Sequence, residues 1–399
     1  MPLRHELPTF FSVVYYQKYL PTSLDLRPAL IRSGYNRKCN RCKFFKLPSP
    51  LSSKEQFFSQ NSFINLRQIE DHLISILMPV KNAGKYLKPC LESILAQSYK
   101  DWELIAINDD STDGSNTVLS EYAAEYINIH TADSEGTGIV SALQKAYGMC
   151  SGNVIHRMDA DDLMPTDKLE RMIAAVAMDT VVTGKVSYFC DDRKIGSGFE
   201  KYTAWLNGLM ESGDFWRDTY RECPIPSSAW MMCRDDFEKI GGFDSVLMPE
   251  DYDLAFRIWK NGLKITRLSG VVHHWRDSAT RISRNDPQYF PIAYVQLKVH
   301  YFIALGRNKK PLVLCGAGKK GKLVAKELLA KGEKFSWVTN NKKKVGKDIY
   351  GIVLQPEEGV DYKNRQTILA ISSPDEQVVL QKELDERYLQ NNEDYFWLF

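Results

Sequence analysis

The chain has 399 residues, of which 44% are hydrophobic and 26% charged, and a formal net charge of +2 at pH 7. This length and apolar content are typical of one or two globular domains with buried cores. The small net charge argues against a protein that binds nucleic acid through its overall charge, and no apolar run approaches the ~20 residues of a membrane-spanning helix. The eight cysteines are scattered, which is typical of reduced thiols, so we expect a cytoplasmic protein.

Residues 1–72 show no clean hydrophobic periodicity and contain several prolines. Residues 1–73 carry 11 Lys and Arg against five Asp and Glu, and a basic, aromatic stretch lies at 37–46. Such a stretch is suited to contact with anionic lipid at the inner face of a plasma membrane. The interpretation we favour is a loosely ordered basic extension.

From residue 73 onward, strand patterns and helix patterns alternate. Buried-strand patterns lie at 73–80, 102–107 and 153–157, and helix patterns lie at 86–97, 118–126 and 139–149. This alternation predicts βαβ units and an α/β fold with a mostly parallel sheet and flanking helices. Ligands of such sheets bind beyond the carboxyl ends of the strands.

Acidic residues follow two of these predicted strands. Asp159 and Asp161 come directly after the strand at 153–157, and Asp109 lies in a polar turn after the strand at 102–107. In an extended segment, residues i and i+2 point to the same side, so Asp159 and Asp161 repel each other unless a cation lies between them. A divalent ion that also binds a diphosphate fits this pair. The alternatives are an acidic loop or acidic decoration of a helix N-terminus.

Four segments resemble the motifs of the family 2 glycosyltransferases, which have the GT-A fold. They are ILMPVKN at 76–82, NDDSTDGS at 108–115, RMDADD at 157–162 and PEDYDLAFR at 249–257. Their order and spacing agree with the family across about residues 73–290, and we place a GT-A domain at residues 73–306. The resemblance implies an inverting transfer of a sugar from a nucleotide-diphosphate sugar to a hydroxyl of a saccharide or glycolipid. It also implies a role in surface polysaccharide or glycolipid biosynthesis.

The resemblance assigns the chemistry to two pairs of acidic residues. Asp251 would be the catalytic base that accepts the proton of the acceptor hydroxyl, with Glu250 beside it to orient it or to contact the acceptor. Asp161, with Asp159 nearby, would hold Mn²⁺ or Mg²⁺ against the leaving diphosphate. The alternative for Glu250 and Asp251 is a structural role at the start of a helix at 252–261.

The resemblance also implies a site for the donor nucleotide, built by Pro79, Asn82, Asp109, Arg157 and Asp159. Asp109 would accept the N3–H of uracil or thymine, so a UDP- or dTDP-sugar is the expected donor, although a guanine N1–H would serve equally. The chain departs from the family pattern twice. Lys81 stands where many members have a tyrosine suited to stacking on the base, and Asp110 replaces a common glycine.

A segment rich in His, Arg and Ser at 273–284 lies where family members fold over the donor phosphates. By that resemblance His274 completes the metal shell, and Arg276 or Arg281 clamps a phosphate. A surface loop with a few basic residues is the alternative. By family position Ser227 and Trp230 lie on the acceptor side, while a buried strand is at least as good an interpretation for Trp230.

A further strand–helix–strand pattern begins at residue 310. A strand at 311–315 is followed by Gly316, Gly318 and Gly321, by a helix at 322–331 and by a second strand at 335–339. This pattern predicts a small Rossmann-like domain at residues 310–399. The second strand ends without the Asp or Glu that would bind ribose hydroxyls, so we slightly favour a packing role for the glycines over nucleotide binding.

Two functions from other classes remain as alternatives. A nucleotidyltransferase can share this sheet and its carboxylates, but it attacks the α-phosphate and releases pyrophosphate. A non-catalytic nucleotide-sugar-binding protein is the second alternative. The presence of both Asp161 and Asp251 argues against it, because binding alone requires no base.

Overall fold

The structure is a computed structural model that describes residues 72–191, 194–245, 247–278, 286 and 289–399. The described residues from Leu73 onward belong to one compact unit. The predicted basic extension lies outside the described residues, apart from His72, and so does Arg281. Within the described ranges, no helix combines the length and the apolar character needed to cross a bilayer.

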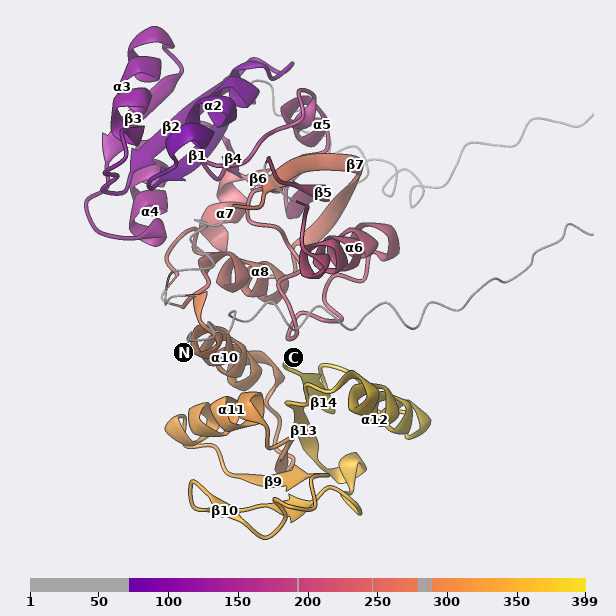
Figure 1. Cartoon of the computed structure of the whole chain (residues 1–399). Coiled ribbons are helices and arrows are strands. Elements are labelled where there is room, and N and C mark those ends of the chain that lie inside the picture. The colour runs from indigo at the N-terminus through magenta and orange to yellow at the C-terminus, as the bar shows by residue number, and fades with distance from the viewer. Residues whose placement is uncertain (1–71, 192–193, 246, 279–285, 287–288) are drawn as a thin grey trace, which may run out of the picture. The chain divides into compact units, whose positions relative to one another are not determined.

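The first sheet has seven strands in the order β3-β2-β1-β4-β6-β5-β7 (Figure 1). Its strands are β1 (Ile74–Val80), β2 (Trp102–Asn108), β3 (Ile129–Asp133), β4 (Val154–Arg157), β5 (Thr180–Phe189), β6 (Trp230–Cys233) and β7 (Lys264–Arg276). All pairs are parallel except those of β6 with β4 and β5. The expected α/β fold with a mostly parallel sheet is therefore confirmed.

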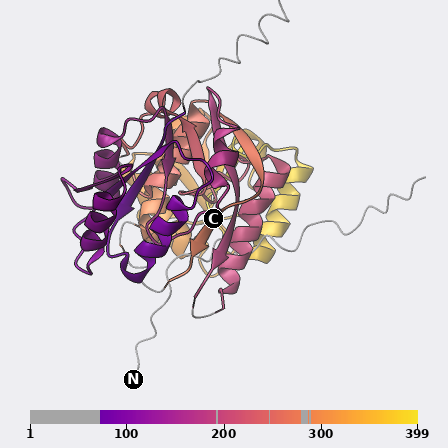
Figure 2. The same cartoon turned by 90° about the horizontal axis from the view of Figure 1, so that it is seen from above.

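Helices cover both faces of this sheet (Figure 2). They are η2 (Gly84–Tyr86), α2 (Leu87–Leu95), α3 (Ser115–Glu125), α4 (Ile139–Met149), α5 (Lys168–Ile173), α6 (Ser197–Ser212), α7 (Arg234–Lys239) and α8 (Glu250–Lys260). Helix α10 (Pro291–Tyr301) and the π-helical turn η4 (Phe302–Gly306) follow in the chain, and α10 packs against α11 (Lys319–Ala330) of the next sheet. Leu77 packs in one core with residues of α4, α7 and α8, whereas its neighbours Ile76 and Met78 pack in the other core with residues of α2, α3, α5 and α6. This alternation follows from the two-residue repeat of a strand.

A second, five-stranded sheet follows in the chain, in the order β12-β9-β8-β13-β14, with all its pairs parallel. Its elements are β8 (Leu312–Cys315), α11 (Lys319–Ala330), β9 (Phe335–Thr339), β12 (Gln355–Pro356), η5 (Tyr362–Asn364), β13 (Gln366–Leu369), α12 (Pro374–Glu386) and β14 (Tyr395–Trp397), with a separate hairpin of β10 (Asp348–Ile349) and β11 (Ile352–Val353). The order β8–α11–β9 agrees with the pattern expected around the glycines.

Two of these glycines have a packing reason. Gly316 has φ +104°, and a Cβ built on it would lie 2.7 Å from the carbonyl oxygen of Ala370. A Cβ on Gly321 would lie 2.1 Å from the carbonyl oxygen of Gly316. Both positions therefore require glycine for close strand–helix packing, whereas a Cβ on Gly318 would meet nothing within 4 Å.

Candidate active site

A pocket lies beyond the carboxyl ends of β1, β2 and β4. Its lining includes nine residues that the sequence predicts for the site: Pro79, Asn82, Asp109, Arg157, Asp159, Asp161, Ser227, Glu250 and Asp251. Neighbouring parallel strands end at the same edge of a sheet, so the loops after β1, β2 and β4 meet there. Glu250 and Asp251 enter the pocket from the first turn of α8.

Arg157, the last residue of β4, joins two of the acidic segments. Its side chain is 4% exposed and donates to Asp159 Oδ1 from Nε at 3.0 Å and to Glu250 Oε1 from Nη1 at 2.9 Å. Burial acts to lower the pKa of Arg157, but the charges of Asp159 and Glu250 outweigh it and raise that pKa. Glu250 Oε2 also accepts a hydrogen bond from the Tyr289 hydroxyl at 3.1 Å. Glu250 is therefore held by two partners.

Asp251 lies next to Glu250 and is partly buried. Burial, followed by the negative charge of Glu250, raises the pKa of Asp251 to about 7, although Arg157 opposes the shift. Its Oδ1 accepts the backbone N–H of Tyr252 at 2.8 Å, which fixes the carboxylate at the start of the helix. A carboxylate with this pKa is suited to accept a proton near neutral pH.

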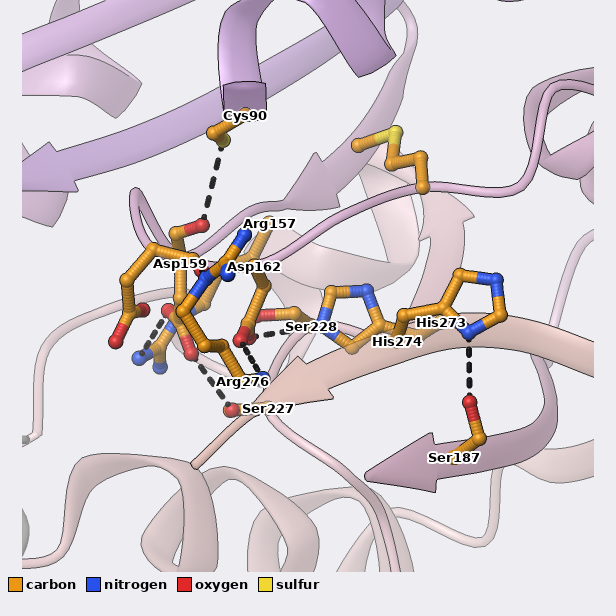
Figure 3. A network of polar contacts seen from close by, with 12 residues as sticks. Cys90, Arg157, Asp159, Asp162, Ser187, Ser227, Ser228, His273, His274 and Arg276 are labelled. Carbon is orange, nitrogen blue, oxygen red and sulfur yellow. Dashed lines mark hydrogen bonds and ion pairs between the residues drawn. The ribbon is translucent and has the colours of Figure 1, made fainter. Parts of the chain in front are cut away.

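The loop after β4 is held in place by a buried network of polar contacts (Figure 3). Asp162 is 1% exposed; its Oδ2 lies 2.9 Å from His273 Nε2, and its Oδ1 accepts the backbone N–H of Arg276 at 2.8 Å. On the other side of the imidazole, Lys168 Nζ lies 3.2 Å from His273 Nδ1 and donates to the carbonyl oxygen of Ser228 at 2.7 Å. Burial lowers the pKa of Lys168 to about 7. This network braces the loop from its buried side.

Asp159 and Asp161 both line the pocket. Asp159 Oδ2 accepts a hydrogen bond from Ser227 Oγ at 3.1 Å, and Ser227 also lines the pocket. Among the residues that the structure describes, no group of three or more His, Cys, Asp and Glu is arranged to hold a metal ion. Two carboxylates still suit Mg²⁺ or Mn²⁺, because such ions are commonly held by one or two carboxylates together with substrate phosphates.

At the base of the pocket, Asp109 is 3% exposed and has two partners. Its Oδ1 accepts the backbone N–H of Gly138 at 3.0 Å, and its Oδ2 lies 3.1 Å from Lys81 Nζ. Asn82 has φ +50° and accepts the backbone N–H of Thr112 through Oδ1 at 2.8 Å. The loops after β1 and β2 are thus joined to each other. Asp110 has φ +55°, the left-handed conformation that explains why glycine is common at that position.

Three predicted site residues, His274, Arg276 and Trp230, do not line the pocket. His274 does not line the pocket, because it lies on strand β7 with its Nδ1 2.6 Å from Ser187 Oγ, on the strand face opposite to that of His273. It is therefore not placed to bind a metal with Asp159 and Asp161. Arg276 also lies outside the lining; its Nε donates to the backbone oxygen of Asp161 at 2.7 Å, and it forms an ion pair with Asp191.

Trp230 was expected on the acceptor side of the cleft but is a core residue. It is 1% exposed and stacks on Phe237 with the ring centroids 5.7 Å apart. The alternative interpretation, a buried strand, is the correct one, because β6 lies between β4 and β5 in the interior of the sheet.

Several residues of the site are not indicated by any motif or periodicity in the sequence. Tyr86, Gly138 and Tyr289 line the pocket, and Lys168 and His273 brace the acidic loop from behind. The only sequence signal for Gly138 is its position directly before the predicted helix α4. Lys168 and His273 are 105 residues apart, and no local pattern indicates their contact.

The chain is similar in sequence to known glycosyltransferases. The family model described as "Glycosyl transferase family 2" matches residues 75–241. A putative glycosyltransferase, EpsE of Bacillus subtilis, is 27% identical over 225 residues, which cover 54% of this chain and 77% of EpsE. WfgD of Escherichia coli, a "UDP-Glc:alpha-D-GlcNAc-diphosphoundecaprenol beta-1,3-glucosyltransferase", is 31% identical over 113 residues, which cover 28% of this chain and only 44% of WfgD.

Among solved structures, TarS of S. aureus in complex with UDP-GlcNAc aligns with a TM-score of 0.46 and 16% identity, covering 65% of this chain and 72% of that one. The family match contains the loops after β1, β2 and β4, which build most of the pocket. Residues 75–241 therefore match the expected family, the family 2 glycosyl transferases, and they contain the part of the mostly parallel sheet that carries the pocket.

Proposed function

We propose that this pocket transfers a sugar, with inversion, from a nucleotide-diphosphate sugar to a hydroxyl acceptor. The observation that carries the proposal is the arrangement of the acidic residues around one pocket. Asp109 lies at one part of the lining, Asp159 and Asp161 at another, and Asp251 at the start of α8. A single displacement requires a base at the acceptor and neutralisation of charge at the leaving diphosphate, and the pocket has carboxylates for both tasks.

Asp251 is the proposed base. As the acceptor oxygen bonds to the anomeric carbon, the bond from that carbon to the diphosphate oxygen breaks, and the nucleoside diphosphate leaves with the electron pair. The acceptor proton passes to Asp251, whose pKa of about 7 suits this transfer. The negative charge of Glu250 helps to raise the pKa of Asp251, and Glu250 is itself held in place by Arg157 and Tyr289.

Asp159 and Asp161 are the proposed ligands of a divalent metal, Mn²⁺ or Mg²⁺. When bound, the metal supplies positive charge that stabilises the leaving diphosphate. Asp159 is oriented by Arg157 and Ser227, so its carboxylate is preorganised for this task. His274 is not included, since it points to Ser187 instead.

The names of two relatives support a setting in surface polysaccharide or glycolipid synthesis. WfgD is named as acting on a sugar linked to diphosphoundecaprenol. TuaG of Bacillus subtilis, 34% identical over 102 residues, is named as a putative teichuronic acid biosynthesis glycosyltransferase. A saccharide carried on a lipid diphosphate is therefore the first class of acceptor to test.

The proposal is tested by incubating the protein with UDP-, dTDP- and GDP-sugars, Mn²⁺ and candidate acceptors. Acceptor-dependent release of a nucleoside diphosphate, with the sugar in inverted configuration on the acceptor, is the expected result. Pyrophosphate released from a nucleoside triphosphate and a sugar phosphate would instead identify a nucleotidyltransferase. Donor binding without turnover across a broad acceptor panel would favour a binding protein and contradict the proposal.

A further inference from the structure

We propose that Lys81 and Asp109 act together to read the base of the donor, and that they select bases in which a ring N–H lies next to a carbonyl. Uracil, thymine and guanine have this edge, whereas cytosine and adenine do not. The inference rests on the proposed function, because it requires a nucleoside diphosphate in the pocket. Its new element is Lys81, a residue that departs from the family pattern.

The two residues are neighbours because of the sheet. Val80 and Asn108 are paired at the ends of β1 and β2, and Asp109 N donates to Val80 O at 2.7 Å. Lys81 and Asp109, the next residues along the two strands, are thereby brought together, with Nζ 3.1 Å from Oδ2. Both line the pocket.

The pair is preorganised by the loops that carry it. Asn82 N donates to Ser111 Oγ at 3.0 Å, and Asn82 Oδ1 accepts the N–H of Thr112 at 2.8 Å, so the two loops are joined directly after the pair. The N–H of Gly138 occupies Oδ1 of Asp109 and fixes the rotation of the carboxylate. Oδ2 is therefore the oxygen that remains beside Lys81. A fixed pair of polar groups discriminates between ligands better than a mobile one.

The chemistry of the pair defines the base edge that it fits. Oδ2 of Asp109 is an acceptor with room for a second hydrogen bond, and the ammonium group of Lys81 has three donors, of which one is directed at Oδ2. The pair thus presents an acceptor next to a donor. A ring N–H can donate to Oδ2 while the adjacent carbonyl accepts from Nζ.

Cytosine and adenine present the opposite edge. Their ring nitrogen is an acceptor and would face the carboxylate, and their amino group is a donor and would face the ammonium. Asp109 is buried, so a base that leaves its oxygen without the expected hydrogen bond incurs a desolvation cost. A site built to hydrogen-bond a ligand rejects strongly those ligands that cannot form the bond.

The test is a calorimetric titration of the full-length protein with UDP, dTDP, GDP, CDP and ADP at one salt and Mn²⁺ concentration. We expect the wild type to bind at least one of UDP, dTDP and GDP about 10-fold or more tightly than CDP and ADP. Lys81→Met should weaken binding of the preferred nucleotide by about 10-fold or more and reduce the preference over CDP to a few-fold. Lys81→Arg, which retains a charged donor, should keep part of the preference.

The matched control is Lys88→Met, which removes the same charge from an exposed lysine that is paired with Glu121 and does not line the pocket. It should bind all five nucleotides like the wild type, and thermal melting of each variant reports folding. If the wild type binds none of the five nucleotides, the proposed function is overturned together with this inference. If the wild type binds UDP and CDP equally, or if Lys81→Met keeps both affinity and preference, the inference alone is overturned.

Discussion

Arg157 Nη1 and Glu250 Oε1 lie 2.9 Å apart, although the two residues are separated by 93 positions in the sequence. Their side chains are 4% and 3% exposed. This buried ion pair connects the end of β4 with the start of α8 and so fixes the distance between the acidic loop and the proposed base.

We expect Arg157→Met to lower the free energy of unfolding by about 3–5 kcal/mol, because it leaves the buried carboxylate of Glu250 without its cation. Urea unfolding followed by circular dichroism measures this loss. In the double variant Arg157→Met/Glu250→Gln the unpaired charge is removed, so a clearly smaller loss is expected. Equal losses in the single and double variants would show that packing rather than charge is responsible.

Asp251→Asn is expected to reduce kcat by about 10²–10⁴-fold, the usual contribution of a positioned base. Donor affinity should change little, because the residue is assigned to the acceptor. Steady-state kinetics with a saturating donor, combined with calorimetric titration of the nucleoside diphosphate, separates the two effects. If the variant has a normal kcat at saturating donor but a much weaker donor affinity, the role of Asp251 is donor binding rather than proton transfer from the acceptor.

The activity of the wild type should depend on pH through Asp251. The carboxylate accepts a proton only when ionised, so kcat/KM should fall as the pH decreases through about 7. Glu250→Gln removes one of the charges that raise the pKa of Asp251, so the falling limb should shift to lower pH. An unchanged limb in Glu250→Gln would assign the titration to another group.

The raised pKa of Asp251 also makes the stability of the protein depend on pH. A rise in pH favours activity, because it ionises the base, but it lowers stability. Folding raises the pKa of Asp251 from its ordinary value of 3.8 to about 7. The native state therefore binds more protons than the unfolded state between about pH 4 and 7. This contribution to stability is fully present below pH 4 and is lost as the pH rises through 7. Asp251→Asn should therefore melt at a higher temperature than the wild type at pH 8, although it is far less active. Differential scanning calorimetry at pH 5 and pH 8 measures the difference, which should be larger at pH 8.

Asp161→Asn should abolish transfer and raise the Mn²⁺ concentration needed for half-maximal donor binding by about 10-fold or more, because the amide keeps the shape but loses the charge. Asp167→Asn is the matched control, since Asp167 is an exposed acid paired with Arg171 just after the loop. Donor binding as a function of Mn²⁺ concentration is the measurement. Full activity of Asp161→Asn, or of the wild type in excess chelator, would contradict a metal-dependent mechanism.

Phe396→Ala should destabilise the protein by about 3–5 kcal/mol, because it leaves a cavity in a packed core. Phe396 is fully buried, with its ring centroid 5.1 Å from that of Tyr220 and 4.8 Å from that of Phe302. Tyr388→Ala is the control, because Tyr388 is 87% exposed. Urea unfolding gives the free energies, and a loss below 1 kcal/mol would show that this contact contributes little.

Much of the fold could be read from the sequence, because the relevant signals are local. The apolar run before Pro79 predicted β1, and the periodicity of 139–149 predicted α4 with its observed bounds. The position of Asp159 and Asp161 after a strand predicted that they would meet Asp109 at one edge of the sheet, because parallel strands end together. The family motifs placed Glu250 and Asp251 beside them.

Other features depended on the tertiary structure, because they arise from contacts between distant segments. Adjacent positions on a strand face opposite sides, but no local pattern tells which of His273 and His274 faces the acidic loop. The pairing of β7 with β5 and the contact of His273 with Asp162 determine that His273 faces the acidic loop. Trp230 likewise became a core residue because β6 was inserted between β4 and β5.

The sequence by itself determined which residue types are available to the pocket and which strand or helix carries each of them. Motifs and periodicity are properties of neighbouring residues, so they can be recognised without the tertiary structure. The tertiary structure decided what each charge faces. It paired Glu250 with Arg157, set Lys81 beside Asp109 and buried Lys168 behind the acidic loop. The physical reason is that burial and the electric field of neighbouring charges depend on the packing of the whole unit, and these determine the pKa values on which the proposed chemistry rests.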